Sequence, residues 1–214
     1  MNQTLTIRRE TPADHAQVEA LIRRAFWNLY VPGCSEHYLA HIIRPHPDFI
    51  PELDLVAELD GRIVGSIMYT HARLVAEDGS EKPILTFGPV CIHPDVQRRG
   101  WGKQLIEASF QRALELGYDT VVIFGDPGNY VGRGFRSCHR FGVTLEDGSF
   151  PAAMLVKELI PGVLGGKHWV YYQSPAFDIS EEEARKFDDL LEPWEKKVLP
   201  CQEEFYILSH ATLS

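Results

Sequence analysis

The sequence lacks any cysteine pattern that would bind zinc or define a disulfide framework. Its four cysteines, Cys34, Cys91, Cys138 and Cys201, are scattered, and no CxxC pair occurs. No apolar run is long enough to cross a bilayer, and the first residues do not have the pattern of a signal peptide. We therefore expect a cytoplasmic protein with reduced thiols, no metal site and no membrane partner.

Positive charge is also scarce. The formal net charge is −9, from 21 Lys and Arg against 30 Asp and Glu. Affinity for a phosphate backbone comes mainly from clustered Lys and Arg, so we expect no nucleic-acid partner. Hydrophobic residues make up 44% of the chain and charged residues 24%, which are ordinary values for a globular protein. A length of 214 residues suits one domain with an elaborated end.

The most informative stretch of the sequence predicts a strand, a polar turn and a helix. Ile84–Ile92 is an apolar strand that Gly88-Pro89 interrupts. His93-Pro94-Asp95 ends this strand, because proline cannot extend a hydrogen-bonded ladder. The turn Gln97–Lys103 follows, and apolar residues then recur at helical spacing as far as Glu115.

The turn Gln97–Lys103 has the features of an anion-binding site. Gly100 and Gly102 allow the backbone to approach a ligand closely, and the amides that open a helix have no partner inside it. The positive end of the helix dipole points the same way. Arg98, Arg99 and Lys103 add formal positive charge. The turn therefore predicts a phosphate site, although it matches neither the Walker loop nor the Rossmann GxGxxG pattern.

The remaining elements predict an α/β (α+β) fold. Thr11 before Pro12 has the pattern of a helix N-cap. Asp60-Gly61 is a strong hairpin signal within a three-strand antiparallel meander. We expect helices at Pro12–Trp27, Glu36–Ile43 and Glu181–Leu191, and strands at Leu5–Arg8, Leu53–Leu59, Arg62–Val75, Thr120–Phe124, Phe135–Phe141, Met154–Leu159, His168–Tyr172 and Glu204–Leu208.

Two motifs resemble those of the GNAT superfamily of acetyl-CoA-dependent N-acetyltransferases. Gln97-x-x-Gly100-x-Gly102 resembles the pyrophosphate loop of that family. Tyr130, four residues before Gly134-Phe135, resembles its later Y-x-x-x-G-F motif. The complete GDPxxYxxxGF segment is most similar to the YhbS-type branch of predicted N-acetyltransferases. The resemblance covers roughly residues 5 to 180.

This resemblance implies a fold, a cofactor and a set of binding residues. The fold would be a mixed, mostly antiparallel sheet, flanked by helices and splayed between two parallel strands, here 84–92 and 120–124. Acetyl-CoA would be the cofactor, with its pantetheine paired to the free edge of the first strand and its diphosphate on the amides of the turn. The expected binding residues are Val90, Cys91, Ile92, Gln97, Arg98, Arg99, Gly100, Trp101, Gly102, Lys103, Asn129 and Arg133.

The implied reaction is direct acetyl transfer to a primary amine in a ternary complex. Tyr130 is the candidate general acid for the departing thiolate, because a phenol stays protonated at neutral pH. The alternative is that its ring only packs beside the cofactor. Cys91 is interpreted as a small buried strand residue and not as a nucleophile, since spacing identifies no His–Asp partner. The candidates for a general base, among which the sequence does not choose, are Glu58, Tyr69, His71 and His93.

The acceptor is the least determined part of the function. In this family it is shaped by segments that correspond here to about 27–50 and 162–177, which contain Trp27, Tyr30, His37, Tyr38, His41, Phe49 and Trp169. These residue types suit a small-molecule amine or a peptide amine. The alternative function is a non-catalytic acyl-CoA-binding sensor, which would need no proton donor at Tyr130. We expect residues 1–180 to form the transferase domain, and 181–214 a helix–strand extension packed on it or at the interface of a homodimer.

Overall fold

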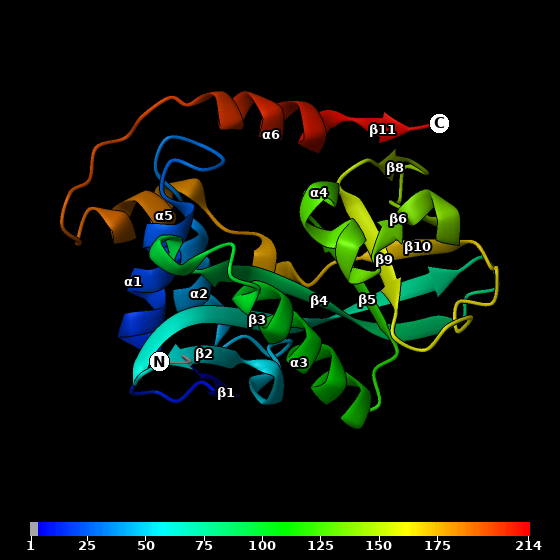
Figure 1. The fold of residues 1–214 in the computed structure, drawn as a ribbon. Helices are drawn as coiled ribbons and strands as arrows, with labels where there is room; N and C mark the ends of the chain where they lie inside the picture. Colours follow the sequence, from blue (N-terminus) through cyan, green and yellow to red (C-terminus); the bar gives the residue numbers. More distant parts are fainter. Residues whose placement is uncertain (1–3) are drawn as a thin grey trace.

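The computed structural model describes residues 4–214 and centres on a nine-stranded sheet with the strand order β1-β2-β3-β4-β5-β9-β6 (Figure 1). Strand β10 pairs with β3 and with β7 at one side of this path. The strands are β1 (Leu5–Arg9), β2 (Leu55–Leu59), β3 (Arg62–Ala76), β4 (Glu81–Ile92), β5 (Thr120–Phe124), β6 (Arg136–Ser137), β7 (Val143–Thr144), β9 (Met154–Glu158) and β10 (Trp169–Tyr172). Strands β8 (Phe150–Pro151) and β11 (Thr212–Leu213) form a separate two-stranded sheet.

Helices cover both faces of the large sheet. They are α1 (His15–Phe26), α2 (Glu36–Ile43), α3 (Trp101–Glu115), α4 (Pro127–Tyr130), α5 (Glu181–Asp188) and α6 (Pro200–His210). Ile67 and Tyr69 of β3 pack in one core cluster with α3, whereas Met68 packs in another with α1 and α2. Because successive strand residues point to opposite faces, α3 lies on one face and the α1–α2 pair on the other. Within residues 4–214, no helix is long and apolar enough to span a membrane.

In the antiparallel meander β2–β3–β4, the turn residues Asp60 and Gly61 have the conformation that the β2–β3 hairpin needs. Asp60 and Gly61 have φ of 51° and 78°, and a two-residue hairpin loop needs positive φ at both positions. Further along, the register of β3 against β4 shifts between Ile67 and Tyr69, opposite the Gly88-Pro89 pair of β4. The sheet is therefore irregular at the middle of β4.

Strands β4 and β5 run parallel but separate almost at once. Their ladder holds only the pair Leu85–Val121. Beyond this pair, the edge of β4 from Phe87 to Ile92 has no strand partner on the β5 side within the described part of the chain. The predicted splay between these two strands is thus present, and it leaves backbone groups free for a ligand.

Several expected elements differ in the structure. Helix α1 begins at His15 and not at Pro12, because Thr11 is not its cap. The Thr11 N–H and hydroxyl both donate to the Asp14 carboxylate, at 2.9 and 2.7 Å, and Arg8 donates to the same carboxylate. These bonds hold the chain in a turn before the helix starts.

Other corrections concern the later elements. Within the expected strand 135–141, only Arg136–Ser137 is extended, and the next residues form a 3₁₀ turn. Helix α5 ends at Asp188, three residues before the expected end. The expected strand Glu204–Leu208 lies inside helix α6, so its aromatic and branched residues were misleading. Pro200 at the first helical position, with the Gln202 side chain accepting from the Leu199 N–H at 3.2 Å, starts a helix there.

Candidate functional site

A cleft of about 740 Å³ opens where β4 and β5 separate. Its walls come from the end of α1 and the following loop, from the last residues of β4, from the turn before α3, from α4, and from the start of α6. The residues expected to bind cofactor that line it are Val90, Cys91, Ile92, Gln97, Arg98, Gly100, Trp101, Gly102, Lys103, Asn129 and Arg133. Tyr130 lines the same cleft. Arg99, an exposed residue of the turn, does not line the cleft.

The turn that opens α3 is shaped by its glycines and by one glutamine. Gly100 is the N-cap of α3 with φ of 85°, a conformation that favours glycine. A Cβ at Gly102 would lie 3.3 Å from Ile92 Cγ1, so this glycine allows the helix to start close against β4. The Gln97 side chain donates to the Ile92 carbonyl at 2.9 Å. The turn is therefore bound to the end of the strand.

Unpaired hydrogen-bond donors gather in this part of the cleft. No backbone bond in residues 4–214 is made by the amides of residues 98–103, and Gly100 provides no side-chain cap. The Trp101 Nε1 and Arg133 Nε donors are also buried without a protein partner. Because burying a donor without a partner costs about 1–3 kcal/mol, this arrangement fits an anionic ligand with several acceptor oxygens.

The side chains at the end of β4 alternate between the two faces of the sheet and therefore have different surroundings. Cys91 is buried against the α1–α2 face, and burial raises the pKa of its thiol to about 12. A thiol in that environment stays protonated and is a poor nucleophile. Val90 and Ile92 point to the opposite face and pack against the α3 core cluster. The contribution of Cys91 to the cleft is therefore one of shape and backbone.

Tyr130 ends the single turn of α4 and packs against the core cluster that contains the α3 residues. Its ring packs against Phe87 and Phe135, with centroid distances of 5.8 and 5.6 Å, and lies over Gly125. Burial raises the pKa of the Tyr130 phenol well above its usual value. The Tyr130 hydroxyl makes no hydrogen bond within the described residues, so its proton is available to a ligand.

None of the four candidate bases lines the cleft. Glu58 is paired with Arg8, Tyr69 with Ser109, and His71 with Tyr118. Arg62 donates to His93 Nε2 at 2.8 Å, and burial followed by the Arg62 charge lowers the pKa of His93. An arginine can only donate, so the lone pair of His93 is already occupied.

The part of the cleft around Tyr30 is aromatic, and Glu36, which acts electrostatically on Tyr30, does not line it. Tyr30 lines this part and stacks on Phe205 of α6, with ring centroids 4.5 Å apart. Glu36 begins α2, and its carboxylate accepts from the Ser35 N–H at 3.1 Å. Burial raises the pKa of Glu36, and burial together with the charges of Glu36 and Asp126 raises the pKa of Tyr30.

The structure separates the aromatic and histidine residues suggested for the acceptor site. Trp27 and Tyr30 line the cleft, whereas Phe49 and Trp169 are buried in core clusters away from it. The remaining members of that set, His37, Tyr38 and His41, pack around Phe187 of α5.

His37 also belongs to a cysteine–histidine–aspartate arrangement that sequence spacing could not reveal. Cys34 Sγ lies 3.4 Å from His37 Nδ1, and His37 Nε2 lies 3.3 Å from Asp188 Oδ1. Arg23 donates to the same Asp188 oxygen at 2.8 Å. Burial raises the pKa of the Cys34 thiol and lowers that of His37, and neither residue lines the cleft. The cluster joins α5 to α1 and α2 as a structural contact.

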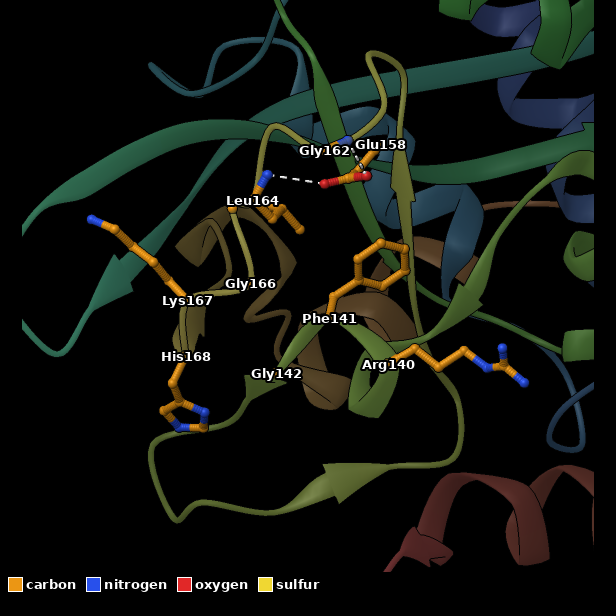
Figure 2. Close-up of a pocket in the computed structure, with 10 residues that line it drawn as sticks. Arg140, Phe141, Gly142, Glu158, Gly162, Leu164, Gly166, Lys167 and His168 are labelled. Carbon is orange, nitrogen blue, oxygen red and sulfur yellow. Dashed lines mark hydrogen bonds between the residues drawn. The ribbon is translucent and has the colours of Figure 1, made fainter.

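A second pocket, of about 510 Å³, lies at the glycine-rich loop 162–168 (Figure 2). The Glu158 carboxylate accepts from the Gly162 and Leu164 amides at 2.7 and 2.9 Å. Figure 2 shows the charged ends of Arg140 and Lys167 pointing away from the pocket, and Lys167 is paired with Asp78. No cluster of potential metal ligands occurs among residues 4–214. This second pocket therefore has no built site for an anion or a metal.

The sequence is similar to known acetyltransferases. The family model described as the Acetyltransferase (GNAT) family matches residues 20–136. The uncharacterized N-acetyltransferase YhbS of Escherichia coli K12 is 29% identical over 133 residues, covering 62% of this chain and 74% of YhbS. The uncharacterized N-acetyltransferase YjhQ of the same strain is 30% identical over 89 residues, covering 41% of this chain and 48% of YjhQ.

Solved structures share the fold. The crystal structure of YhbS from Escherichia coli in complex with CoA has a TM-score of 0.71 at 23% identity, covering 84% of this chain and 94% of that chain. A GNAT family acetyltransferase from Brucella melitensis in complex with acetyl-CoA has a TM-score of 0.63 at 24% identity, covering 83% of this chain and 100% of that one. The fold predicted from the sequence is confirmed by these likenesses.

Proposed function

The chain belongs to the acetyltransferase (GNAT) family, and from this premise we propose that it moves an acetyl group from acetyl-CoA directly to a primary amine. One observation supports this proposal above the others. The unpartnered amides of residues 98–103, the free edge of β4 and the Tyr130 hydroxyl all belong to one cleft. The residues present fit a ligand that has a diphosphate at one end and a reacting group at the other.

Each part of the cleft has a separate binding task. The amides of 98–103, with Trp101 Nε1 and Arg133, hold the diphosphate. The free backbone groups of Val90–Ile92 pair with the pantetheine amides like an added strand. When bound, acetyl-CoA supplies the acetyl thioester. Holding both reactants in place provides on the order of several kcal/mol of the rate enhancement.

Tyr130 is the proton donor in this proposal. The neutral acceptor nitrogen forms a bond to the acetyl carbon while the carbon–sulfur bond breaks, and the Tyr130 phenol gives its proton to the departing sulfur. The nitrogen loses one proton to solvent as the amide forms, and the Tyr130 phenolate takes one up to restore the phenol. Its raised pKa keeps that proton in place at neutral pH until the thiolate develops. The acceptor nitrogen must reach the site neutral, so an acceptor that arrives as an ammonium ion first gives a proton to solvent.

Replacing Tyr130 by Phe tests the proposal. The packing on Phe87 and Phe135 remains, so the affinity for acetyl-CoA measured by calorimetry should change little. The turnover number measured by thiol release should fall by about 10² to 10⁴-fold. Full turnover in this variant would remove Tyr130 as the acid. Acetyl-CoA binding without turnover of any amine by the unmodified protein would favour a non-catalytic sensor.

A further inference from the structure

The segment after α5 crosses the cleft and is fixed at both of its ends. We call residues 195–213 the C-terminal strap. At its first end, Trp27 Nε1 and Asn28 Nδ2 both donate to the Glu195 carbonyl at 3.0 Å. The Lys197 amide donates to Asn28 Oδ1, also at 3.0 Å. Asn28 is only 7% exposed, so the strap is attached to a buried part of the loop after α1.

The other end of the strap is attached to the opposite half of the molecule. Strand β11 pairs with β8, with Thr212 opposite Pro151, and the Ala152 amide donates to the Ala211 carbonyl at 2.8 Å. Between the two attachments, α6 passes from the α1 side to the side of α4 and β8 (Figure 1). No residue of α6 is buried, so this helix bridges two regions and does not pack into a core.

The underside of the strap is part of the cleft wall. Leu199 and Cys201 line the cleft together with Tyr130 and the turn before α3. Phe205 extends this wall by its stack on Tyr30, with the two rings 28° from parallel. The acceptor end of the cleft is therefore bounded above by the strap and at its side by the aromatic pair Tyr30–Phe205.

We propose that the C-terminal strap restricts the acceptor to small primary amines with an apolar body. This inference rests on the proposed function. The whole cleft measures about 740 Å³, a volume typical of a single small-molecule ligand, and the cofactor must occupy much of it. A wall that is attached at both ends limits the bulk of an acceptor that can enter the cleft beneath it.

The surface of the acceptor end agrees with such a ligand. Aromatic faces bind cations and apolar groups, which the Tyr30–Phe205 pair provides. Four basic residues line the cleft. Arg98, Lys103 and Arg133 lie with the residues assigned to the diphosphate, and Arg24 lies near the end of α1.

The test compares two acceptors in the full-length protein by thiol release. Phenethylamine represents a small apolar amine, and a short peptide with one internal lysine represents a bulky one. The unmodified protein should use phenethylamine with a kcat/KM at least about tenfold higher than that for the peptide. Phe205→Ala removes the stack on Tyr30 and should reduce this preference by about tenfold.

Tyr206→Ala is the matched control. Tyr206 neighbours Phe205 on α6, is 57% exposed, and stacks only on His210, so this variant should keep the preference of the unmodified protein. Equal use of peptide and phenethylamine by the unmodified protein would overturn the inference while leaving the transferase intact. So would an unchanged preference in a folded Phe205→Ala variant. No binding of acetyl-CoA by calorimetry would overturn the proposed function itself, and the inference with it.

Discussion

The two ends of the cleft are built in different ways. The cofactor end comes from one continuous stretch, β4, the turn 97–103 and α3, and it presents mainly backbone groups. The acceptor end combines a loop after α1 with a strap that lies more than 160 residues later, and it presents side chains. Backbone recognition of a shared cofactor needs local geometry, whereas recognition of a particular acceptor needs residues from distant segments.

The largest expected effect lies at the cofactor end. Gly102→Glu places bulk against Ile92 and a negative charge beside the free amides. We expect acetyl-CoA affinity, measured by calorimetry, to fall by about 100-fold or more, since two kinds of repulsion act together. Gln104→Glu, an exposed position outside the cleft wall, adds the same charge nearby and should change affinity much less. Equal losses in both variants would contradict the placement of the diphosphate.

The next effect tests the first attachment of the strap. Asn28→Gly keeps the positive φ of 60° but removes the amide that bonds Glu195, Lys197 and Gly33. The free energy of unfolding in urea should fall by about 2–4 kcal/mol, because buried partners lose their hydrogen bonds. Asn129→Gly, which removes an exposed side chain that makes no such bonds, serves as the control. If Asn28→Gly had the same free energy of unfolding as the unmodified protein, the bonds of Asn28 would not hold the strap.

A smaller effect concerns the ion-pair cluster that joins the end of β1 to α1 and α2. Arg44 of the α2 end binds Glu10 and Glu19, and Asp54 is buried beside Glu10. Burial and the neighbouring Glu10 raise the pKa of Asp54 to about 9, so the folded state holds a proton that the unfolded state releases near pH 4. The contribution of Asp54 to the free energy of unfolding should therefore be greatest below pH 4 and should decline as pH rises towards 9.

Asp54→Asn mimics the protonated carboxyl and removes this titration. It should raise the free energy of unfolding by on the order of 1–3 kcal/mol at pH 8 and by less at pH 5. Urea unfolding at both pH values measures the difference. If Asp54→Asn instead lowered the free energy of unfolding by the same amount at pH 5 and pH 8, Asp54 would be ionised in the folded protein.

The smallest effect tests the underside of the strap without any acceptor. Cys201 lines the cleft and Cys34 does not, although both are partly exposed. Saturating acetyl-CoA should slow alkylation of Cys201 by N-ethylmaleimide severalfold, about fivefold or more, and leave Cys34 at its original rate. Mass spectrometry of the digested protein separates the two sites. Equal rates at Cys201 with and without acetyl-CoA would place the strap away from the bound cofactor.

The same contrast explains what the sequence could predict. The pattern Gln97-x-x-Gly100-x-Gly102 is local, and each glycine has a backbone reason, so its place beside β4 could be inferred. Tyr130 was identified differently, by its resemblance to the Y-x-x-x-G-F motif of the family. The Tyr30–Phe205 stack and the Asn28–Glu195 bond join segments with no periodic or spacing relation, so no sequence pattern indicates them.

The expected strand Glu204–Leu208 is wrong for a local reason. The segment has the composition of a strand, but Pro200 and the cap at Leu199–Gln202 begin a helix there.

The candidates for a general base stay predictions. None of them lines the cleft, and Arg62, which is distant in sequence, donates to His93.

The attachment of the strap at two points also has a consequence for the choice of acceptor. Every residue assigned to the cofactor lies within the part of the chain that the family shares, and the strap lies wholly outside that part. Under the proposal above, substitutions at Phe205 or Leu199 would alter the accepted amines without changing any residue assigned to the cofactor.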